Sequence, residues 1–248
     1  MKTFFERMSE LLAMAAETLW SRQVVCQGCG DRSGADEDYL CVRCADRLKE
    51  IESASENRCL TCGNPAEAKC ICKNISHVTA ARYSYYYQKP VSGIIQHLKY
   101  SGVTCMAEWM AERMYETLLR EDWLEDVHAI VPVPMPPKRQ REREYNQAEL
   151  LAEALAKATN LPMLKLLERT GETPRQVRLS GRERRENVKN AFRAVTDAKG
   201  LTILLVDDVR TTGATIDACA QALLKAGAGE VLALTFAAVS RPVEEKNE

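Results

Sequence analysis

The stretch ILLVDDVRTTGATIDACAQALLKAGA, from Ile203 to Ala228, joins three kinds of local structure in one run. An apolar, β-branched segment predicts a buried strand that ends in two adjacent carboxylates, Asp207 and Asp208. A loop of Thr and Gly follows, and the remainder has the apolar spacing of an amphipathic helix. Ligands of open α/β sheets bind beyond the carboxyl ends of the strands, so the motif predicts a binding site there.

The residue types of this motif suit a sugar phosphate. Two adjacent carboxylates repel each other and need counter-ligands, which are either sugar hydroxyls or Mg²⁺. The Thr/Gly loop offers hydroxyls, backbone N–H groups and a helix N-terminus to a phosphate. Together these features predict a ribose 5-phosphate site. The alternative is a structural Thr cap beside an acidic turn, which we disfavour because all the features fall in one strand–loop–helix context.

The segment DDVRTTGAT resembles the phosphoribosyl pyrophosphate (PRPP) motif of type I phosphoribosyltransferases. The resemblance implies that Asp207 and Asp208 are catalytic and bind the ribose hydroxyls. The 6-oxopurine salvage enzymes carry an Asp at the position of Thr211, and a Thr cannot act as that base at neutral pH. Oxopurine salvage is therefore disfavoured, and the role of Arg210, where many members are apolar, stays open. The resemblance implies that the 5′-phosphate is wrapped by Thr211, Thr212, Gly213, Ala214 and Thr215.

Strand and helix patterns alternate through the last two thirds of the chain. This alternation predicts a parallel α/β sheet. Strands are expected over 78–87, 128–134, 163–168 and 230–239, and helices over 91–100, 104–120 and 147–158. The Tyr-rich strand could stack nucleic-acid bases, but a half-buried sheet strand is the favoured interpretation.

Two basic segments accompany the motif. The run PPKRQREREYNQ follows a Pro-rich turn and would face the pyrophosphate of PRPP, although a solvated basic turn is the alternative. Residues 169–193 hold eight Lys or Arg against three Glu and form a long loop or flap. This flap could close over PRPP or follow a nucleic-acid backbone. Lys138 and Arg139 are assigned to PRPP, and further anion or DNA contacts to Arg141, Arg143, Arg182, Arg184 and Arg185.

Eight of the ten cysteines occur as close pairs between residues 26 and 72. Two such knuckles complete a tetrahedral site of four thiolates, which leaves no open position and so predicts two structural zinc ions. A cross-braced pairing is possible, and a redox or iron–sulfur role is the weaker interpretation. Cys105 and Cys219 are expected to be small core residues. In sequential pairing one zinc would take Cys26, Cys29, Cys41 and Cys44, and the other Cys59, Cys62, Cys70 and Cys72.

As a set, these motifs resemble the ComF family. The set consists of VPVP followed by the basic run and N-Q, a T-x-x-Q at Thr173, an R-x-x-N at Arg184, DDVRTTGAT, and the cysteine pairs, which match the family's double zinc ribbon. The segment HLKYSG resembles a Lys-Tyr-x-Gly signature of the family, which makes Lys99 a candidate anion contact. The resemblance implies PRPP binding with Mg²⁺ and a role in DNA uptake with single-stranded DNA and uptake or recombination proteins.

The bulk properties of the 248-residue chain fit an intracellular protein of two parts. The net charge of −1 implies that any anion-binding surface is local. No signal peptide or apolar run of transmembrane length is seen, so we expect a cytoplasmic location with reduced thiols. The expected fold is a type I phosphoribosyltransferase-like α/β sheet with flanking helices, preceded by a double zinc ribbon. The expected segments are an amphipathic helix over 1–22, the ribbon over 23–75, the transferase-like domain over 76–240 and a charged tail over 241–248.

Two hypotheses of function remain open at this point. One is an enzyme that transfers phosphoribose from PRPP to an unknown base or small molecule, without any role in competence. The other is a PRPP-gated module that binds single-stranded DNA or uptake proteins. The sequence leaves open the acceptor, whether turnover occurs and the oligomeric state.

Overall fold

The centre of the molecule is a four-stranded sheet in which every neighbouring pair of strands is parallel. The computed structural model describes residues 25–31, 39–53, 57–66, 68, 70–100, 104–143, 145–170 and 191–239. The strand order is β1-β6-β5-β2, so the strand that carries the acid pair is central. The strands are β1 (Ala80–Tyr86), β2 (Ala129–Pro132), β5 (Thr202–Arg210) and β6 (Glu230–Ala238).

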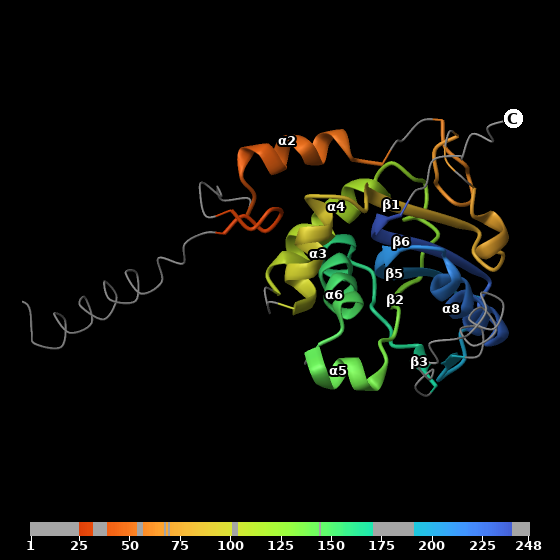
Figure 1. The fold of residues 1–248 in the computed structure, drawn as a ribbon. Coiled ribbons are helices and arrows are strands. Elements are labelled where there is room, and N and C mark those ends of the chain that lie inside the picture. The colour runs from red at the N-terminus through yellow and green to blue at the C-terminus, as the bar shows by residue number, and fades with distance from the viewer. Residues whose placement is uncertain are drawn as a thin grey trace, which may run out of the picture.

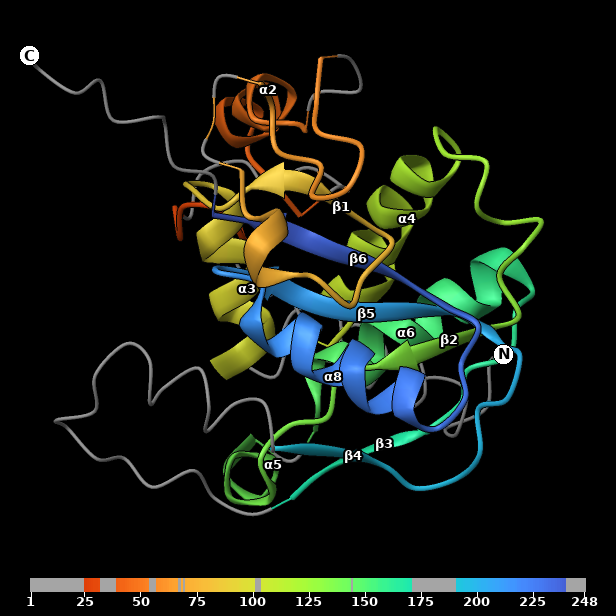
Figure 2. The same ribbon diagram turned by 90° about the vertical axis from the view of Figure 1, so that its right-hand side faces the viewer.

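Helices cover both faces of this sheet, as a parallel sheet requires. Helices α3 (Val91–Tyr100), α4 (Met106–Leu118) and α6 (Gln147–Thr159) lie on one face, and α8 (Ala214–Lys225) lies on the other (Figures 1 and 2). The predicted alternation of strands and helices is therefore confirmed. Strands β1, β5 and β6 and helices α3, α4, α6 and α8 all form close to their predicted bounds.

One expectation about the chain between α6 and β5 was wrong. The strand predicted over 163–168 is instead β3 (Leu167–Arg169), and it pairs antiparallel with β4 (Phe192–Ala194) outside the main sheet. Before α6, the basic run that follows the Pro-rich turn forms the helix α5 (Pro137–Arg143), which was not expected there. Proline is favoured at the first position of a helix, where its missing N–H needs no partner. The proline at position 137 could therefore have indicated the start of this helix from the sequence.

The cysteine-rich segment has little regular structure and packs into the hydrophobic cores on both faces of the sheet. Among its described residues, the regular elements are helix α2 (Val42–Glu50) and the 3₁₀ turn η1 (Cys72–Asn74). Cys26, Cys41 and Cys44 pack into the core that α3, α4 and α6 form against the sheet. Cys62 and Ile75 pack into the second core, on the face covered by α8. The two halves of the cysteine segment therefore support opposite faces of the sheet.

Candidate functional site

The acid pair lies on β5 at the point where the neighbouring strand ends. Pairing of β2 with β5 stops at Val206, whereas pairing of β6 with β5 continues to Arg210. Asp207 and Asp208 therefore lie within the strand but at an open edge of the sheet. Since successive side chains of a strand point to opposite faces, the two carboxylates leave the sheet on opposite sides. Asp208 shares its face with α3, and Asp207 shares its face with α8.

A lysine from α3 reaches the carboxylate of Asp208. The Nζ atom of Lys99 forms an ion pair with Oδ2 of Asp208, and these side chains are 21% and 12% exposed. The backbone N–H of Asp208 donates to Oδ1 of Asp207 at 2.8 Å. Burial and the neighbouring charge of Asp208 raise the pKa of Asp207 well above its usual range, while the charge of Lys99 lowers it. The ammonium of Lys99 is thus a neighbouring counter-charge of the acid pair.

The Thr/Gly loop joins β5 to the N-terminus of α8. Thr211 and Thr212 are exposed, so their hydroxyls are accessible to a ligand. The hydroxyl of Thr212 accepts a hydrogen bond from the backbone N–H of Ala214 at 3.4 Å. Gly213 caps the helix at φ 86°, a conformation that favours glycine. Three features of an anion site, small residues, hydroxyls and a helix N-terminus, meet beside the acid pair.

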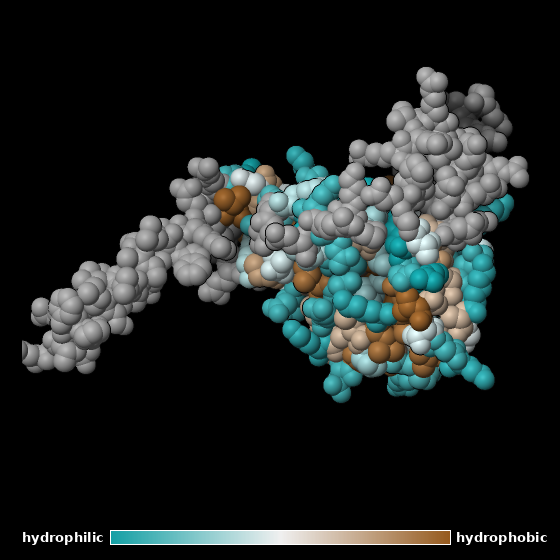
Figure 3. All heavy atoms as spheres, turned by 90° about the horizontal axis from the view of Figure 1, so that it is seen from below, coloured by the Kyte–Doolittle hydropathy of each residue, from teal (hydrophilic) through white to brown (hydrophobic). Residues whose placement is uncertain are grey.

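The basic run contributes a charged helix near the end of α3. The guanidinium of Arg143 lies 4.6 Å from the ring centroid of Tyr100 and donates to its hydroxyl at 2.8 Å. Arg143 also donates to Oε1 of the buried Gln147 at 3.1 Å. Helix α5 lies at the bottom of the molecule in Figure 1, and the coloured part of the face seen from that side has both hydrophilic and hydrophobic areas (Figure 3). The side chains of Lys138 and Arg141 lie outside the described residues.

One cation near this helix was not singled out from the sequence. Arg169 on β3 packs its guanidinium 5.2 Å from the ring centroid of Phe192. Burial lowers the pKa of Arg169, and the nearby charge of Arg139 lowers it further. Arg139 on α5 and Arg169 on β3 are therefore neighbours in space. The sequence placed Arg169 only within a long basic segment, because the pairing of β3 with β4 could not be seen there.

Other predicted positions have mixed outcomes. The flap residues Arg182, Arg184 and Arg185, the N-terminal helix over 1–22 and the charged tail lie outside the described residues. Tyr83 and Tyr85 are buried, which agrees with a sheet strand rather than a base-stacking surface. Cys219 is buried as expected, but the prediction for Cys105 was wrong. Cys105 is exposed because it precedes the first turn of α4.

The structure groups the cysteines in sequential order. In each set of four, the Sγ atoms all lie within 4.8 Å of one another, which excludes the cross-braced pairing for this fold. Zinc–sulfur bonds of about 2.3 Å in a tetrahedron separate the sulfurs by about 3.8 Å. The sulfurs of Cys59 and Cys70 are 4.0 Å apart, and those of Cys62 and Cys70 are 3.7 Å apart. The first cluster (Cys26, Cys29, Cys41 and Cys44) and the second cluster (Cys59, Cys62, Cys70 and Cys72) both fit a structural zinc ion.

The electrostatics of the thiols agree with a metal at each centre. The backbone N–H of Cys62 helps to lower the pKa of Cys59 to about 7, which favours the thiolate that zinc requires. Burial and neighbouring thiols raise the pKa of Cys72. A bound cation such as zinc would stabilise four thiolates at this short spacing.

The fold and the acid pair before a Thr/Gly loop define a protein with a type I phosphoribosyltransferase fold, and residues 147–248 match the family model "Phosphoribosyl transferase domain". The DNA utilization protein YhgH of Salmonella typhimurium is 32% identical over 202 residues, covering 77% of this chain and 87% of that protein. Competence protein F of Haemophilus influenzae is 34% identical over 153 residues, covering 59% and 67%. Competence protein ComFC of Bacillus subtilis is 26% identical over 202 residues, covering 77% and 80%. The chain belongs to the ComF family.

Membrane insertion through a helix finds no support in the described part of the chain. None of its helices combines the length and the apolar character that a membrane span needs.

Proposed function

We propose that the chain binds PRPP at the open edge of β5. The carboxylates of Asp207 and Asp208 would accept hydrogen bonds from the ribose hydroxyls. The loop from Thr211 to Thr215 would receive the 5′-phosphate. The observation that carries this proposal is the end of β2 at Val206, which places both carboxylates beyond the end of the neighbouring strand, just before the loop that leads to the N-terminus of α8.

The pyrophosphate of PRPP would lie toward the cations that surround this edge. Lys99 already pairs with Asp208, and Arg139 of α5 is a neighbour of Arg169 of β3. Lys138 and Arg141 belong to the same basic helix. Mg²⁺ would accompany the pyrophosphate, where it supplies positive charge to the phosphate oxygens, and carboxylate oxygens also suit it.

Transfer of phosphoribose breaks the bond between C1 of the ribose and the pyrophosphate. The chain would assist by orienting the ribose through its hydroxyls and by stabilising the charge of the departing pyrophosphate with Lys99 and the α5 cations. An oxopurine is a disfavoured acceptor, because Thr211 offers no carboxylate to handle a purine proton. Whether the chain turns over PRPP or only binds it is the question that the first experiment addresses.

A role in handling single-stranded DNA is the biological part of this proposal. The relatives are named competence or DNA utilization proteins. Next to Lys99, the ring of Tyr100 is 72% exposed and is held by the guanidinium of Arg143. Exposed aromatic rings and Arg planes are the groups on which nucleobases stack. DNA contacts would also come from Arg182, Arg184 and Arg185, and the location would be cytoplasmic, where DNA enters single-stranded and thiols are reduced.

The test measures pyrophosphate release over time by zinc-loaded protein mixed with Mg²⁺, PRPP, a panel of nucleobases and single-stranded DNA. The double variant Asp207→Asn/Asp208→Asn is the control. Release above that control establishes phosphoribosyl transfer or hydrolysis, and the productive panel member identifies the acceptor. PRPP that protects the wild-type chain against thermal unfolding without release supports the binding module. Absence of both effects would remove the proposal.

A further inference from the structure

We propose that the second cluster is a positioning element for the phosphate loop, so that zinc bound by Cys59, Cys62, Cys70 and Cys72 sets the affinity for PRPP. The proposal rests on the PRPP site described above. It assigns to this zinc a role beyond holding its own segment together. Three contacts carry it, and each joins the cluster segment to β5, the loop or α8.

The first contact is made by Arg210, the last residue of β5 and the residue directly before the loop. Arg210 is 2% exposed. Its Nη1 donates to the backbone carbonyl of Cys62 at 2.5 Å, and its Nη2 donates to Oδ1 of Asn64 at 2.6 Å. Both acceptors belong to the knuckle of the second cluster. The guanidinium also lies 5.0 Å from the ring centroid of Tyr83 on β1.

The charge of Arg210 explains why this contact depends on the metal site. A buried guanidinium needs acceptors and opposite charge, since burying an unpaired ion is costly. Zinc with four thiolates carries net negative charge, so the loaded cluster would supply a counter-charge next to Arg210. If the knuckle opened, Arg210 would lose its hydrogen bonds to Cys62 and Asn64, and the start of the loop would lose its anchor.

The second contact is a close approach of backbone at Gly213. A Cβ atom added there would lie 2.3 Å from Cγ2 of Ile75 and 3.4 Å from Cδ1 of Ile71. Ile71 stands between the ligands Cys70 and Cys72, and Ile75 is fully buried. The loop backbone therefore packs directly on the segment that completes the cluster. This packing is possible because Gly213 has no side chain, and the positive φ of Gly213 also favours glycine.

The third contact fixes the same segment to α8. The backbone N–H of His77 donates to Oδ1 of Asp217 at 2.8 Å, and Nδ1 of His77 lies 3.1 Å from Oδ2. On the next turn of α8, Nε2 of Gln221 lies 3.2 Å from Nε2 of His77. Residues 71–77 thus contact both the loop and the helix whose N-terminus would face the phosphate. A shift of this segment would move both.

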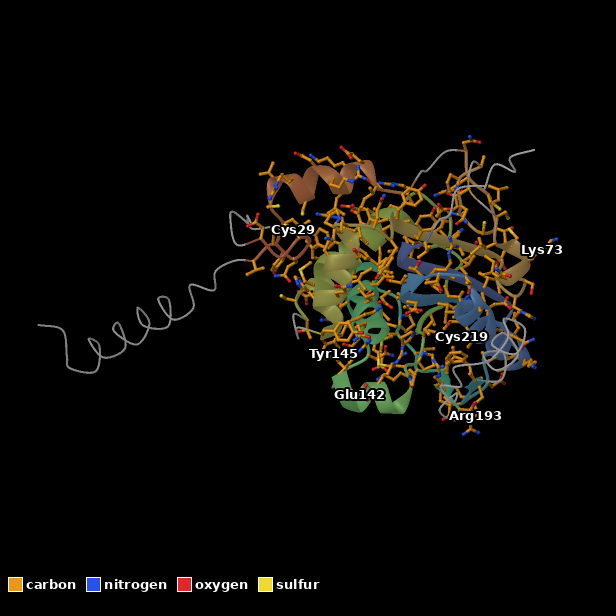
Figure 4. The ribbon with its side chains drawn as sticks, in the orientation of Figure 1. Cys29, Lys73, Glu142, Tyr145, Arg193 and Cys219 are labelled. Atoms are coloured by element: carbon orange, nitrogen blue, oxygen red, sulfur yellow. The ribbon has the colours of Figure 1, made fainter. Side chains whose placement is uncertain are left out.

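The first cluster makes a different set of contacts. A Cβ at Gly28 would meet Pro90 at 2.5 Å, and one at Gly93 would meet the carbonyl oxygen of Gly28 at 2.1 Å, so this knuckle packs on the start of α3. Cys29 and Lys73, the latter next to the second cluster, lie on opposite sides of the molecule (Figure 4). The first cluster therefore provides an internal control for zinc loss.

The experiment compares Cys70→Ser with Cys29→Ser, because both thiols are exposed members of their clusters. Zinc content, PRPP affinity by calorimetry and backbone amide exchange over 211–217 are measured in the full chain with Mg²⁺. We expect each variant to lose one zinc. Only Cys70→Ser should weaken PRPP binding, by about tenfold, and speed exchange in the loop. Equal losses in both variants, or loss of zinc without loss of affinity in Cys70→Ser, would overturn the proposal.

A second pair of variants tests the coupling without touching a cysteine. Arg210→Met should keep both zinc ions but weaken PRPP binding and speed exchange in the loop, and Arg210→Lys should restore part of the affinity. Arg113→Met is the matched control, because Arg113 also packs over an aromatic ring, 5.2 Å from the centroid of Trp109. An Arg210→Met chain with wild-type PRPP affinity and wild-type amide exchange in the loop would contradict the proposal. This test remains decisive even if Cys70→Ser fails to fold. If the wild-type chain binds no PRPP, the proposed function fails. Amide exchange over 211–217 still decides whether the second cluster positions the loop.

Discussion

The carboxylates of the proposed PRPP site come from the interior of the sheet, whereas its cations come from a helix end and from a short basic helix at the surface. Asp208 is 8% exposed and stands on a central strand paired on both sides up to Val206. Arg139 is exposed, and Arg143 is only half-buried. Lys99, at the last turn of α3, connects the two regions through its ion pair with Asp208.

This difference separates what is fixed before the ligand arrives from what can adjust to it. The ribose side is preorganised, because the backbone of β5 sets both carboxylate positions and their desolvation is a cost of folding rather than of binding. The pyrophosphate side consists of long, flexible side chains, some of them solvated, so fixing them around a polyanion is in part a cost of binding. Substitutions on the ribose side should therefore have the larger effects, and four predictions test this order.

The largest effect is expected from Asp208→Asn. The change removes a charged acceptor from the proposed ribose site and leaves Lys99 without its carboxylate partner. Each hydrogen bond to a charged group contributes about 1.5–3 kcal/mol, so PRPP affinity should fall on the order of 100-fold. Calorimetric titration with PRPP in the presence of Mg²⁺ measures this affinity. Asp126→Asn, at an exposed position, is the matched control and should bind as wild type. An Asp208→Asn chain with unchanged affinity would place the ribose elsewhere.

The same contrast decides how much the sequence could reveal. The ribose side lies within one continuous segment, so its strand, loop and helix could be predicted from local periodicity. The cysteine spacing predicted two sites of four thiolates but did not decide between sequential and cross-braced pairing. The hydrogen bond between Arg210 and Cys62 joins residues 148 positions apart. The proximity of Arg139 to Arg169 depends on the pairing of β3 with β4. Contacts of this kind depend on tertiary register, which local pattern does not encode.

A smaller effect, about tenfold on PRPP affinity at neutral pH, is expected from Lys99→Met. The charge of Lys99 lowers the pKa of Asp207, and its removal would raise that pKa further above the ordinary value. A ribose site that requires the ionised pair should then lose affinity on the acid side, with its midpoint moved to higher pH. Affinity is measured across a pH series for Lys99→Met and for Lys99→Arg, which keeps the charge. Parallel curves for Lys99→Met and wild type would show that Lys99 does not tune the pair.

A modest effect, about threefold, is expected from Arg143→Met on PRPP binding. Its effect on the binding of single-stranded DNA should be larger, because the change removes the cation–π partner that holds the ring of Tyr100 in place for stacking. The measurement is the fluorescence of 2-aminopurine placed in an oligonucleotide, which is quenched when the base stacks. Tyr100→Phe should keep the quenching, and Tyr100→Leu should abolish it. Leu119→Ala, an exposed apolar residue at the end of α4, is the control. Equal quenching in Tyr100→Leu and wild type would exclude this ring as a stacking surface.

The last effect concerns the stability of the ligand-free chain, not its affinity for PRPP, and tests whether the ribose side is strained. Burial and the charge of Asp208 raise the pKa of Asp207 above the ordinary 3.8. Between these two values the folded chain keeps a proton that the unfolded chain has lost, so the free energy of unfolding falls as the pH rises through this window. Above the raised pKa, the loss of stability is complete and the free energy of unfolding no longer changes through this group.

Urea unfolding across this range should show the fall in wild type but not in Asp207→Asn, which carries no charge at that position. Mg²⁺ with PRPP should offset the fall, because binding favours the ionised pair and stabilises the folded state. Identical pH profiles for wild type and Asp207→Asn would mean that the ribose side stores no electrostatic strain, and the contrast between the two sides of the site would then rest on geometry alone.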